Sequence, residues 1–227
     1  NIVNLLELES EEKITAMFAI KEFADDKFLF FVTRQGVAKR VVLSDLQNIR
    51  RAGLRALNLN EDDALVDVRL TDGEQNILIA THEGRAICFD ENEVRAMGRD
   101  TMGVRGMNVP PIARVLGMEI AKPDTELFVI TEKGYGKRTP ISEYPEHHRG
   151  GQGVFTITMT EKKGLLAAMK IVAPDEEIMI MSEEGVRVRT PVSGISELGR
   201  STQGVRVMNV ADNDRVTAVA IASSGKK

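Results

Sequence analysis

Residues 131–140 read Thr-Glu-Lys-Gly-Tyr-Gly-Lys-Arg-Thr-Pro, and the fold follows from this stretch because the chain repeats its pattern. A run of β-forming residues, 127–131, precedes Gly134 and a basic run follows it, which predicts two strands joined by a tight hairpin at residues 132–134. The hairpin glycine recurs at intervals of 48, 50 and 51 residues, as Gly36, Gly84, Gly134 and Gly185. A period of this length is typical of propeller-like arrays and solenoids.

Other residue types recur at fixed distances from the hairpin glycine. The tenth residue after it is apolar, in turn Leu46, Val94, Tyr144 and Ile195. The fifteenth is always an arginine, in turn Arg51, Arg99, Arg149 and Arg200. A second glycine then opens a short apolar segment, at Gly53, Gly103, Gly153 and Gly204. Agreement at so many positions indicates one array built from a single repeating unit.

Each repeat is expected to form short strands. In the first repeat these are residues 28–33, 37–43, 54–59 and 64–70, with an irregular or short helical loop at 44–49. A lone four-stranded sheet cannot bury both faces, whereas sheets stacked as blades around an axis can. We therefore predict an all-β, propeller-like array of four-stranded blades.

The array is predicted to be one domain over residues 1–227. Its repeats cover approximately residues 21–70, 71–120, 121–171 and 172–222. Residues 1–20 match only the second half of a repeat, so we expect them to be the remnant of a preceding blade.

Composition narrows the protein class. With 42% hydrophobic residues, the 227-residue chain can form a real core. No run approaches the roughly 20 apolar residues that a membrane helix needs, and no signal peptide is evident, so we expect a soluble cytoplasmic protein. The single cysteine, Cys88, excludes an internal disulfide and is interpreted as a small core residue.

Charge is distributed unevenly along the repeats. The net charge is −4, but the four windows 36–57, 84–107, 134–157 and 185–208 hold 16 basic and 8 acidic residues, a net +8 against −12 elsewhere. If blades are arranged radially, these windows form a curved basic belt suited to a phosphate backbone. Arginines that merely solvate exposed strands are the plain alternative, but their recurrence at one offset favours the belt.

The basic residues of the windows are the candidate DNA contacts. The absence of tryptophan and the few aromatic residues favour duplex over single-stranded DNA, and no base-reading helix or zinc pattern is present. The candidates are Lys39, Arg40, Arg50, Arg51, Arg55, Arg85, Arg95, Arg99, Arg105, Lys137, Arg138, Arg149, Arg187, Arg189, Arg200 and Arg206.

Several motifs resemble the C-terminal domain of the bacterial DNA gyrase A subunit. They are Val-Asn-Leu-Leu at residues 3–6, Val-Arg-Ala-Met-Gly-Arg at 94–99, Glu-Lys-Gly-Tyr-Gly-Lys-Arg-Thr at 132–139 and Gly-Arg-Ser-Thr-Gln-Gly-Val at 199–205. The resemblance covers essentially the whole chain. It implies a six-bladed β-pinwheel, whose blades exchange strands and whose basic perimeter wraps duplex DNA, and a fragment that lacks the first blade.

The resemblance also implies partners and cofactors. Within the gyrase holoenzyme, a type IIA topoisomerase, the domain would act with the gyrase A N-terminal region and the gyrase B subunit in a heterotetramer. ATP and Mg would belong to that holoenzyme, which introduces negative supercoils, and no cofactor or membrane partner is expected for this domain. The catalytic tyrosine of the family belongs to another region, so no catalytic residue is expected here.

A glycine-rich loop resembles the signature heptapeptide of the family, Gln-Arg-Arg-Gly-Gly-Lys-Gly, which belongs to the first blade. The loop keeps one arginine and three glycines of that heptapeptide. Its glycines would let backbone N–H groups approach a phosphate while the arginine binds it, although an ordinary tight loop is an equally good interpretation. This box-like loop comprises His147, His148, Arg149, Gly150, Gly151, Gln152 and Gly153.

Other functions remain as alternatives. The corresponding domain of topoisomerase IV would bend DNA without strong chiral wrapping, and a protein-scaffolding propeller would bind peptides independently of salt. A metal site is not expected, because His147 and His148 are adjacent and no carboxylate or thiolate stands at ligand spacing. Residues 212–214 lack the glycine and glutamate of a calcium loop, so they are interpreted as a turn.

Overall fold

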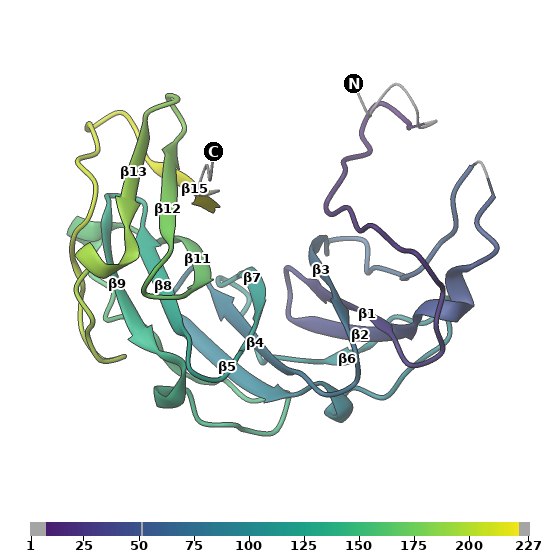
Figure 1. The fold of residues 1–227 in the computed structure, drawn as a ribbon. Coiled ribbons are helices and arrows are strands. Elements are labelled where there is room, and N and C mark those ends of the chain that lie inside the picture. The colour runs from purple at the N-terminus through teal and green to yellow at the C-terminus, as the bar shows by residue number, and fades with distance from the viewer. Residues whose placement is uncertain (1–7, 51, 223–227) are drawn as a thin grey trace.

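The computed structural model describes residues 8–50 and 52–222, and these form four antiparallel β-sheets placed side by side along an arc (Figure 1). The first sheet has the strand order β3 (Leu65–Thr71), β1 (Phe28–Thr33), β2 (Val37–Val42) and β6 (Val104–Arg105). The second has the order β7 (Val115–Ile120), β4 (Asn76–Thr81), β5 (Arg85–Asp90) and β10 (Val154–Phe155).

The remaining sheets continue this arrangement. The third has the order β11 (Leu166–Val172), β8 (Glu126–Thr131), β9 (Tyr135–Pro140) and β14 (Val205–Arg206). The fourth has three strands, β15 (Val216–Ala222), β12 (Glu177–Ser182) and β13 (Arg187–Pro191). Short 3-10 turns connect strands, namely η2 (Leu43–Leu46), η3 (Glu91–Glu93), η4 (Ile141–Glu143), η5 (Glu161–Lys163) and η6 (Val192–Gly194).

Each four-stranded sheet has one edge strand, β6, β10 or β14, that belongs to the following repeat. In the first sheet, β6 pairs with β2 through Val37 with Arg105 and Ala38 with Val104. β10 and β14 pair with β5 and β9 in the same register. Successive blades therefore exchange a strand, as the resemblance to a pinwheel implied.

The strand predicted at residues 54–59 is wrong, because these residues are coil. The equivalent segments, 104–105, 154–155 and 205–206, become strands by pairing with the preceding repeat. Within the described residues no sheet precedes the first one, so residues 54–59 have no strand to pair with. The fourth sheet has three strands rather than the predicted four for the converse reason, since no described repeat follows it.

The predicted hairpins are confirmed. β8 and β9 are joined at Gly134, which has φ of 89°, and the hairpin glycines Gly36, Gly84 and Gly185 have φ between 86° and 91°. Only glycine adopts this left-handed conformation without strain. Gly134 also lies so close to the next repeat that a Cβ atom would approach the Met208 carbonyl oxygen to 2.1 Å.

The core lies between adjacent sheets. Phe30 of β1 and Phe89 of β5 pack in the first such layer, with ring centroids 6.3 Å apart. The apolar residues ten positions after each hairpin glycine are all buried, and they follow the 3-10 turns η2, η3, η4 and η6 directly or end them. The expectation of a short helical loop at 44–49 is thus met in part by η2. Cys88 is buried, as predicted.

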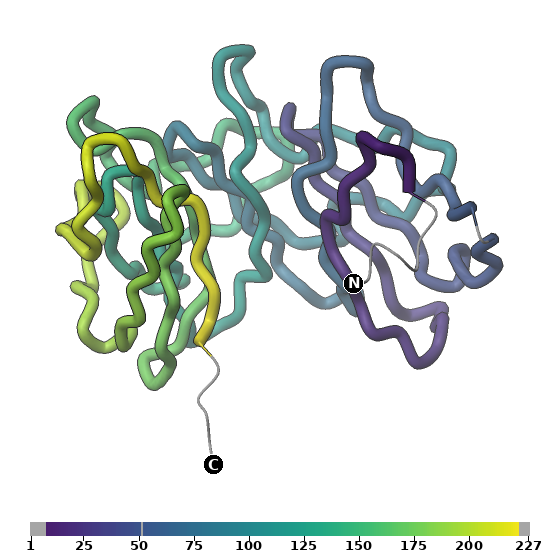
Figure 2. Tube along the Cα trace, turned by 90° about the horizontal axis from the view of Figure 1, so that it is seen from above, coloured from purple at the N-terminus to yellow at the C-terminus, as the bar shows by residue number. Residues whose placement is uncertain are grey.

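The four sheets leave one side of the arc open (Figure 1), and Figure 2 views the molecule from that side. Strand β3 contacts β7, β7 contacts β11, and β11 contacts β15. All four strands lie toward the hollow of the arc (Figure 1). The described residues thus hold four of the six blades that the resemblance implied. The sequence predicts a remnant of a preceding blade at residues 1–20. The structure describes residues 8–20 of this segment, and they contain no strand. No helix of the described residues has the length and apolarity required to cross a membrane.

The hairpin glycines provide a first test. We expect Gly185→Ala to lower the free energy of unfolding by about 1–2 kcal/mol, because it adds left-handed strain but its Cβ atom meets nothing within 4 Å. Gly134→Ala adds the same strain and a backbone clash, so its loss should be larger by at least about 1 kcal/mol. Urea denaturation of both variants measures the difference, and equal losses would contradict the interlocking of the third and fourth repeats.

Candidate nucleic-acid interface

The structure separates the sixteen candidate DNA contacts into different environments. Arg51 lies outside the described residues. Lys39, Arg40 and Lys137 are buried and Arg138 is nearly so, while Arg85, Arg99, Arg149 and Arg200 are half-buried. The exposed candidates are Arg50, Arg55, Arg95, Arg105, Arg187, Arg189 and Arg206.

Lys39 and Lys137, at equivalent positions of β2 and β9, are 0% exposed. The Lys39 ammonium donates to the carbonyls of Ala56, Arg99 and Thr101 at 2.7–2.8 Å. The Lys137 ammonium donates to three carbonyls of the next repeat at 2.6–3.1 Å. Both ammonium groups are enclosed by backbone, so neither reaches a phosphate, and the prediction that these lysines contact DNA is wrong for this structure.

Arg40 and Arg138, the next residues along each strand, also bind protein groups. The Arg40 Nε donates to the carbonyl of Val94 at 2.8 Å, and the Arg138 Nε donates to that of Ile195 at 2.7 Å. Each guanidinium also pairs with a carboxylate, Glu91 for Arg40 and Glu126 for Arg138. They connect one blade to the 3-10 turn of the next, so the structure withdraws them from the candidate DNA contacts as well.

Two of the arginines fifteen positions after the hairpin glycine, Arg149 and Arg200, fasten neighbouring blades in a second way. Arg149 donates through Nε to the Glu93 carbonyl and through Nη1 to the Arg105 carbonyl, both at 3.0 Å. Arg200 makes the equivalent bonds to the carbonyls of Glu143 and Phe155. Their recurrence in the sequence therefore has a structural cause. Both side chains are only half-buried, and neither uses all five N–H groups in these bonds.

A third group of arginines marks each exchanged strand. We call Arg85, Arg105 and Arg206 the junction arginines, because each belongs to one of the cross-strand pairs that join β5 to β10, β2 to β6 and β9 to β14. The Arg85 guanidinium stacks 4.2 Å from the Phe155 ring centroid, and that of Arg206 lies 5.2 Å from the Tyr135 ring. An aromatic face attracts the cation and holds its side chain in place. Charges at successive junctions therefore follow the outer edge of the arc.

Sequence reasoning missed two contributors to this edge. The Tyr135 hydroxyl accepts a hydrogen bond of 2.6 Å from the Arg206 guanidinium, and this contact lowers the pKa of the hydroxyl. The Lys163 ammonium lies 4.8 Å from the centroid of the same ring, although Lys163 stands outside the basic windows. No signal in the linear sequence brings these residues together, because the register of the exchanged strand decides which residues meet.

The remaining exposed candidates differ in their pairing. Arg189 is bound to Glu177 across the hairpin, with Nε 2.6 Å from the carboxylate. Among the described residues, the side chains of Arg50, Arg55, Arg95 and Arg187 have no recorded hydrogen-bond or ion-pair partner. These four therefore remain available for an external anion.

The box-like loop is occupied by protein groups. The Glu93 carboxylate accepts from the backbone N–H of Arg149 and contacts the His148 imidazole, whose pKa it raises. The N–H of Gly150 donates to the Gly106 carbonyl at 2.7 Å. Two backbone donors of the loop are thus used within the protein, one by an acidic side chain, which favours the ordinary-loop interpretation at residues 147–153.

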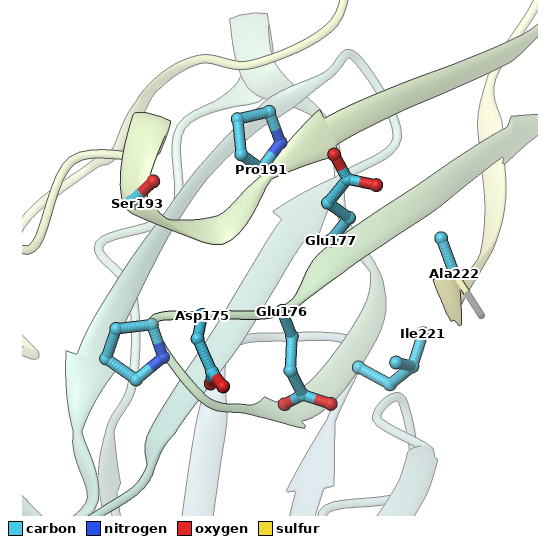
Figure 3. Close-up of a pocket in the computed structure, with 8 residues that line it drawn as sticks. Asp175, Glu176, Glu177, Pro191, Ser193, Ile221 and Ala222 are labelled. Carbon is cyan, nitrogen blue, oxygen red and sulfur yellow. The ribbon is translucent and has the colours of Figure 1, made fainter. Parts of the chain in front are cut away.

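An acidic cavity of about 640 Å³ lies at the end of the fourth sheet where Glu177 pairs with Pro191 and Ala222 (Figure 3). Asp175, Glu176 and Glu177 line it together with Pro191 and Ile221. Its carboxylates would repel a phosphate backbone. Within the described residues no three His, Cys, Asp or Glu side chains are grouped as a metal site would require.

The turn at residues 212–214 contains a carboxylate that binds backbone groups. Asp214 accepts from the N–H groups of Glu184 and Arg215 at 3.0 and 2.8 Å. This is the turn chemistry that the sequence predicted. Tyr144 is buried, and burial raises the pKa of its hydroxyl to about 12.

Comparison with known proteins identifies the family. A model of the family described as "DNA gyrase C-terminal domain, beta-propeller" matches residues 27–72, 75–122, 125–173 and 176–223. The chain belongs to this family. The DNA gyrase A subunits of Staphylococcus epidermidis and Staphylococcus aureus are each 41% identical to it over 222 residues, which is 96% of the chain. The chain spans 25% of the length of these relatives.

Solved structures agree with this assignment. A C-terminal domain of DNA topoisomerase IV superposes with a TM-score of 0.90 at 27% identity, covering 97% of the chain and 69% of that structure. A DNA gyrase A C-terminal domain gives a TM-score of 0.86 at 27% identity, covering 97% and 74%. The gyrase-type C-terminal domain described here is thus an all-β pinwheel, as predicted.

Arg138 and Arg189 each lie four residues after a hairpin glycine, so comparing them tests the structural role of Arg138. The side chains of Arg138 and Glu126 are 14% and 10% exposed, whereas those of Arg189 and Glu177 are 49% and 43% exposed. Arg138→Ala leaves a buried carboxylate without its partner, so we expect a loss of about 3 kcal/mol in the free energy of unfolding. Arg189→Ala should cost less than about 1 kcal/mol. Urea denaturation compares them, and similar losses would show that burial does not distinguish the two pairs.

Proposed function

We propose that this domain binds duplex DNA along its outer edge without sequence preference, as an accessory domain of a type IIA topoisomerase. The observation that carries the proposal is the series of junction arginines, which recurs at three successive exchanged strands. Phosphates also recur at regular intervals along a duplex, so a periodic row of fixed cations suits a DNA backbone. Family membership, and the DNA topoisomerase names of its relatives, support the same function.

The position of the arginines sets the path that we propose for the DNA. The junction arginines lie on or beside the outermost strands, and Arg95 and the half-buried Arg200 lie in the segments that lead into those strands. The acidic cavity lies at one end of the strands of the fourth sheet, where Glu177 pairs with Pro191 and Ala222. A duplex that followed the arc would therefore contact the outer edge and avoid this acidic end.

We further propose that, in the whole protein, DNA bent around this edge is presented for ATP-driven strand passage that introduces negative supercoils. The gyrase A N-terminal region and the gyrase B subunit would be the partners, and ATP and Mg would bind there. Bending a site of 20–30 base pairs costs on the order of 1–6 kcal/mol, which contacts spread along several blades can offset.

A topoisomerase IV domain is the second candidate, favoured by the TM-score of 0.90 to such a domain. Both candidates bind duplex DNA and differ in whether the bend is wrapped with one hand. The complete enzyme, given ATP and relaxed plasmid, separates them on an agarose gel. Negative supercoils indicate gyrase, whereas decatenation without negative supercoiling indicates topoisomerase IV.

Salt dependence tests DNA binding itself. If about six phosphates are neutralised, log K should fall with log salt concentration at a slope near −5. Fluorescence anisotropy with duplexes of unrelated sequence measures this slope, which should be the same for each duplex. A slope near zero, together with binding to peptides, would instead support a protein-scaffolding propeller.

Charge reversal tests the path. Arg95 and Arg105 are exposed and lack a recorded side-chain hydrogen bond within the described chain, so the double change Arg95→Glu and Arg105→Glu should leave the fold intact. We expect it to weaken DNA binding on the order of 10- to 100-fold and to reduce the salt slope by about 2.

The matched control is the double change Arg114→Glu and Lys122→Glu, two exposed residues outside the basic windows. It alters the net charge equally and should weaken binding much less. Equal losses from both pairs would mean that total charge, rather than the outer edge, determines binding.

A further inference from the structure

The buried lysines shape loops of the neighbouring repeat. We call residues 98–103, 148–153 and 199–204 the edge loops, because each leads into an exchanged strand. In the last edge loop, Lys137 binds the carbonyls of Gly199, Arg200 and Thr202 at 2.6, 2.8 and 3.1 Å, and the Thr202 hydroxyl at 3.0 Å. The Ser201 carbonyl accepts from the Thr158 hydroxyl at 2.8 Å. Three carbonyls of this loop thus point at the buried ammonium, and the fourth accepts from an exposed hydroxyl.

Peptide geometry then fixes the direction of the N–H groups. In a trans peptide the carbonyl and the following N–H point in opposite directions, and the described chain has no cis peptide bond. The N–H groups of Arg200, Ser201 and Gln203 therefore face outward, and none of them has a recorded acceptor in the part of the chain that the structure describes. Outward N–H groups beside a guanidinium form a concavity that suits an anion.

The first edge loop repeats this arrangement. Lys39 binds the carbonyls of Arg99 and Thr101 at 2.7 and 2.8 Å, and the Asn58 side-chain amide donates to the Asp100 carbonyl at 2.6 Å. The N–H groups that follow the two lysine-bound carbonyls, those of Asp100 and Met102, are turned outward by the same geometry.

The middle edge loop lacks the buried lysine and uses two of its N–H groups within the protein. Ile87 replaces the lysine, and the loop uses the N–H groups of Arg149 and Gly150 to bind Glu93 and the Gly106 carbonyl. A buried lysine therefore occurs in the two edge loops whose N–H groups at Asp100 and Ser201 have no acceptor among the described residues, and it is missing from the loop whose equivalent N–H group, at Gly150, binds the Gly106 carbonyl.

We propose that Lys39 and Lys137 are positioning residues of the DNA-binding edge, which act from the interior by turning the N–H groups of the edge loops toward DNA phosphates. Neither lysine touches the DNA. The inference rests on the proposed function, since it names how the same edge is organised. It assigns the recurring basic residue of strands β2 and β9 a role that charge alone does not reveal.

Protonation of Lys137 provides a specific readout. An ammonium has three N–H groups for the three carbonyls, whereas the neutral amine has two. Burial lowers the pKa of Lys137 to about 8, opposed by the Glu143 carboxylate and assisted by the Arg200 guanidinium, the two charged groups that face it. As the pH rises through this value, Lys137 loses its proton, and the loop loses the charge that orients it.

The experiment measures duplex affinity by fluorescence anisotropy at constant salt, from about pH 7 to about pH 9. All proteins carry Tyr135→Phe, so that the edge hydroxyl with its lowered pKa does not titrate. We expect the parent to lose about tenfold in affinity over this range. Lys137→Met should be about tenfold weaker than the parent at pH 7 and should lose much less affinity than the parent as the pH rises, because Lys39 and His148 can still titrate. Ile87→Met, at the equivalent position without a lysine, should bind within about twofold of the parent.

The outcomes distinguish this inference from the proposed function. If Lys137→Met binds as tightly as the parent, or keeps the full pH dependence of the parent, the positioning role is wrong while DNA binding stands. If the parent does not bind duplex DNA at all, the proposed function fails. Should Lys137→Met fail to fold, amide hydrogen exchange of the parent decides. Slower exchange at Ser201 and Gln203 on DNA binding supports the inference, and unchanged exchange at both overturns it.

Discussion

Every complete sheet of this domain depends on a strand that the following repeat supplies. The exchanged strands are only two residues long, and they cover the edges of β2, β5 and β9 that would otherwise be open. A repeat cannot close its own sheet, so neighbouring repeats must fold together. When residues are counted from the hairpin glycine of each repeat, residue 21 of one repeat pairs with residue 1 of the preceding repeat, as Arg105 pairs with Val37. The row of junction arginines is a direct result of this exchange.

Basic residues have two roles in this architecture. The loops that connect neighbouring blades contain backbone carbonyls that no sheet ladder satisfies, and a buried carbonyl requires a donor. Lysine and arginine reach these carbonyls from an adjacent repeat, as Lys137 and Arg200 do. Other arginines stack on aromatic rings at the surface and remain accessible. The positive charge of the windows is therefore partly internal, and the accessible part lies along the outer edge.

The sequence predicted the period, the hairpins at positions such as Gly134 and the buried residues such as Val94, because each has a local signature. It did not separate Lys137 from Arg206, because blades stack on both faces of the middle strands and the usual alternation of buried and exposed residues is lost. The pairing of Arg85 with Phe155 could not be predicted from the sequence either, since it depends on the register of a strand some 70 residues away. Residues 54–59 have strand propensity but no described partner, and propensity alone does not form a strand.

The central claim is that a duplex follows the outer edge where strands are exchanged. A crystal structure of the domain with a duplex about 30 base pairs long tests it most directly. The account predicts phosphates within hydrogen-bonding distance of the guanidinium groups of Arg105, Arg85 and Arg206 in successive blades. A duplex bound along the inner strands β3, β7 and β11, or at the acidic cavity near Asp175, would contradict it.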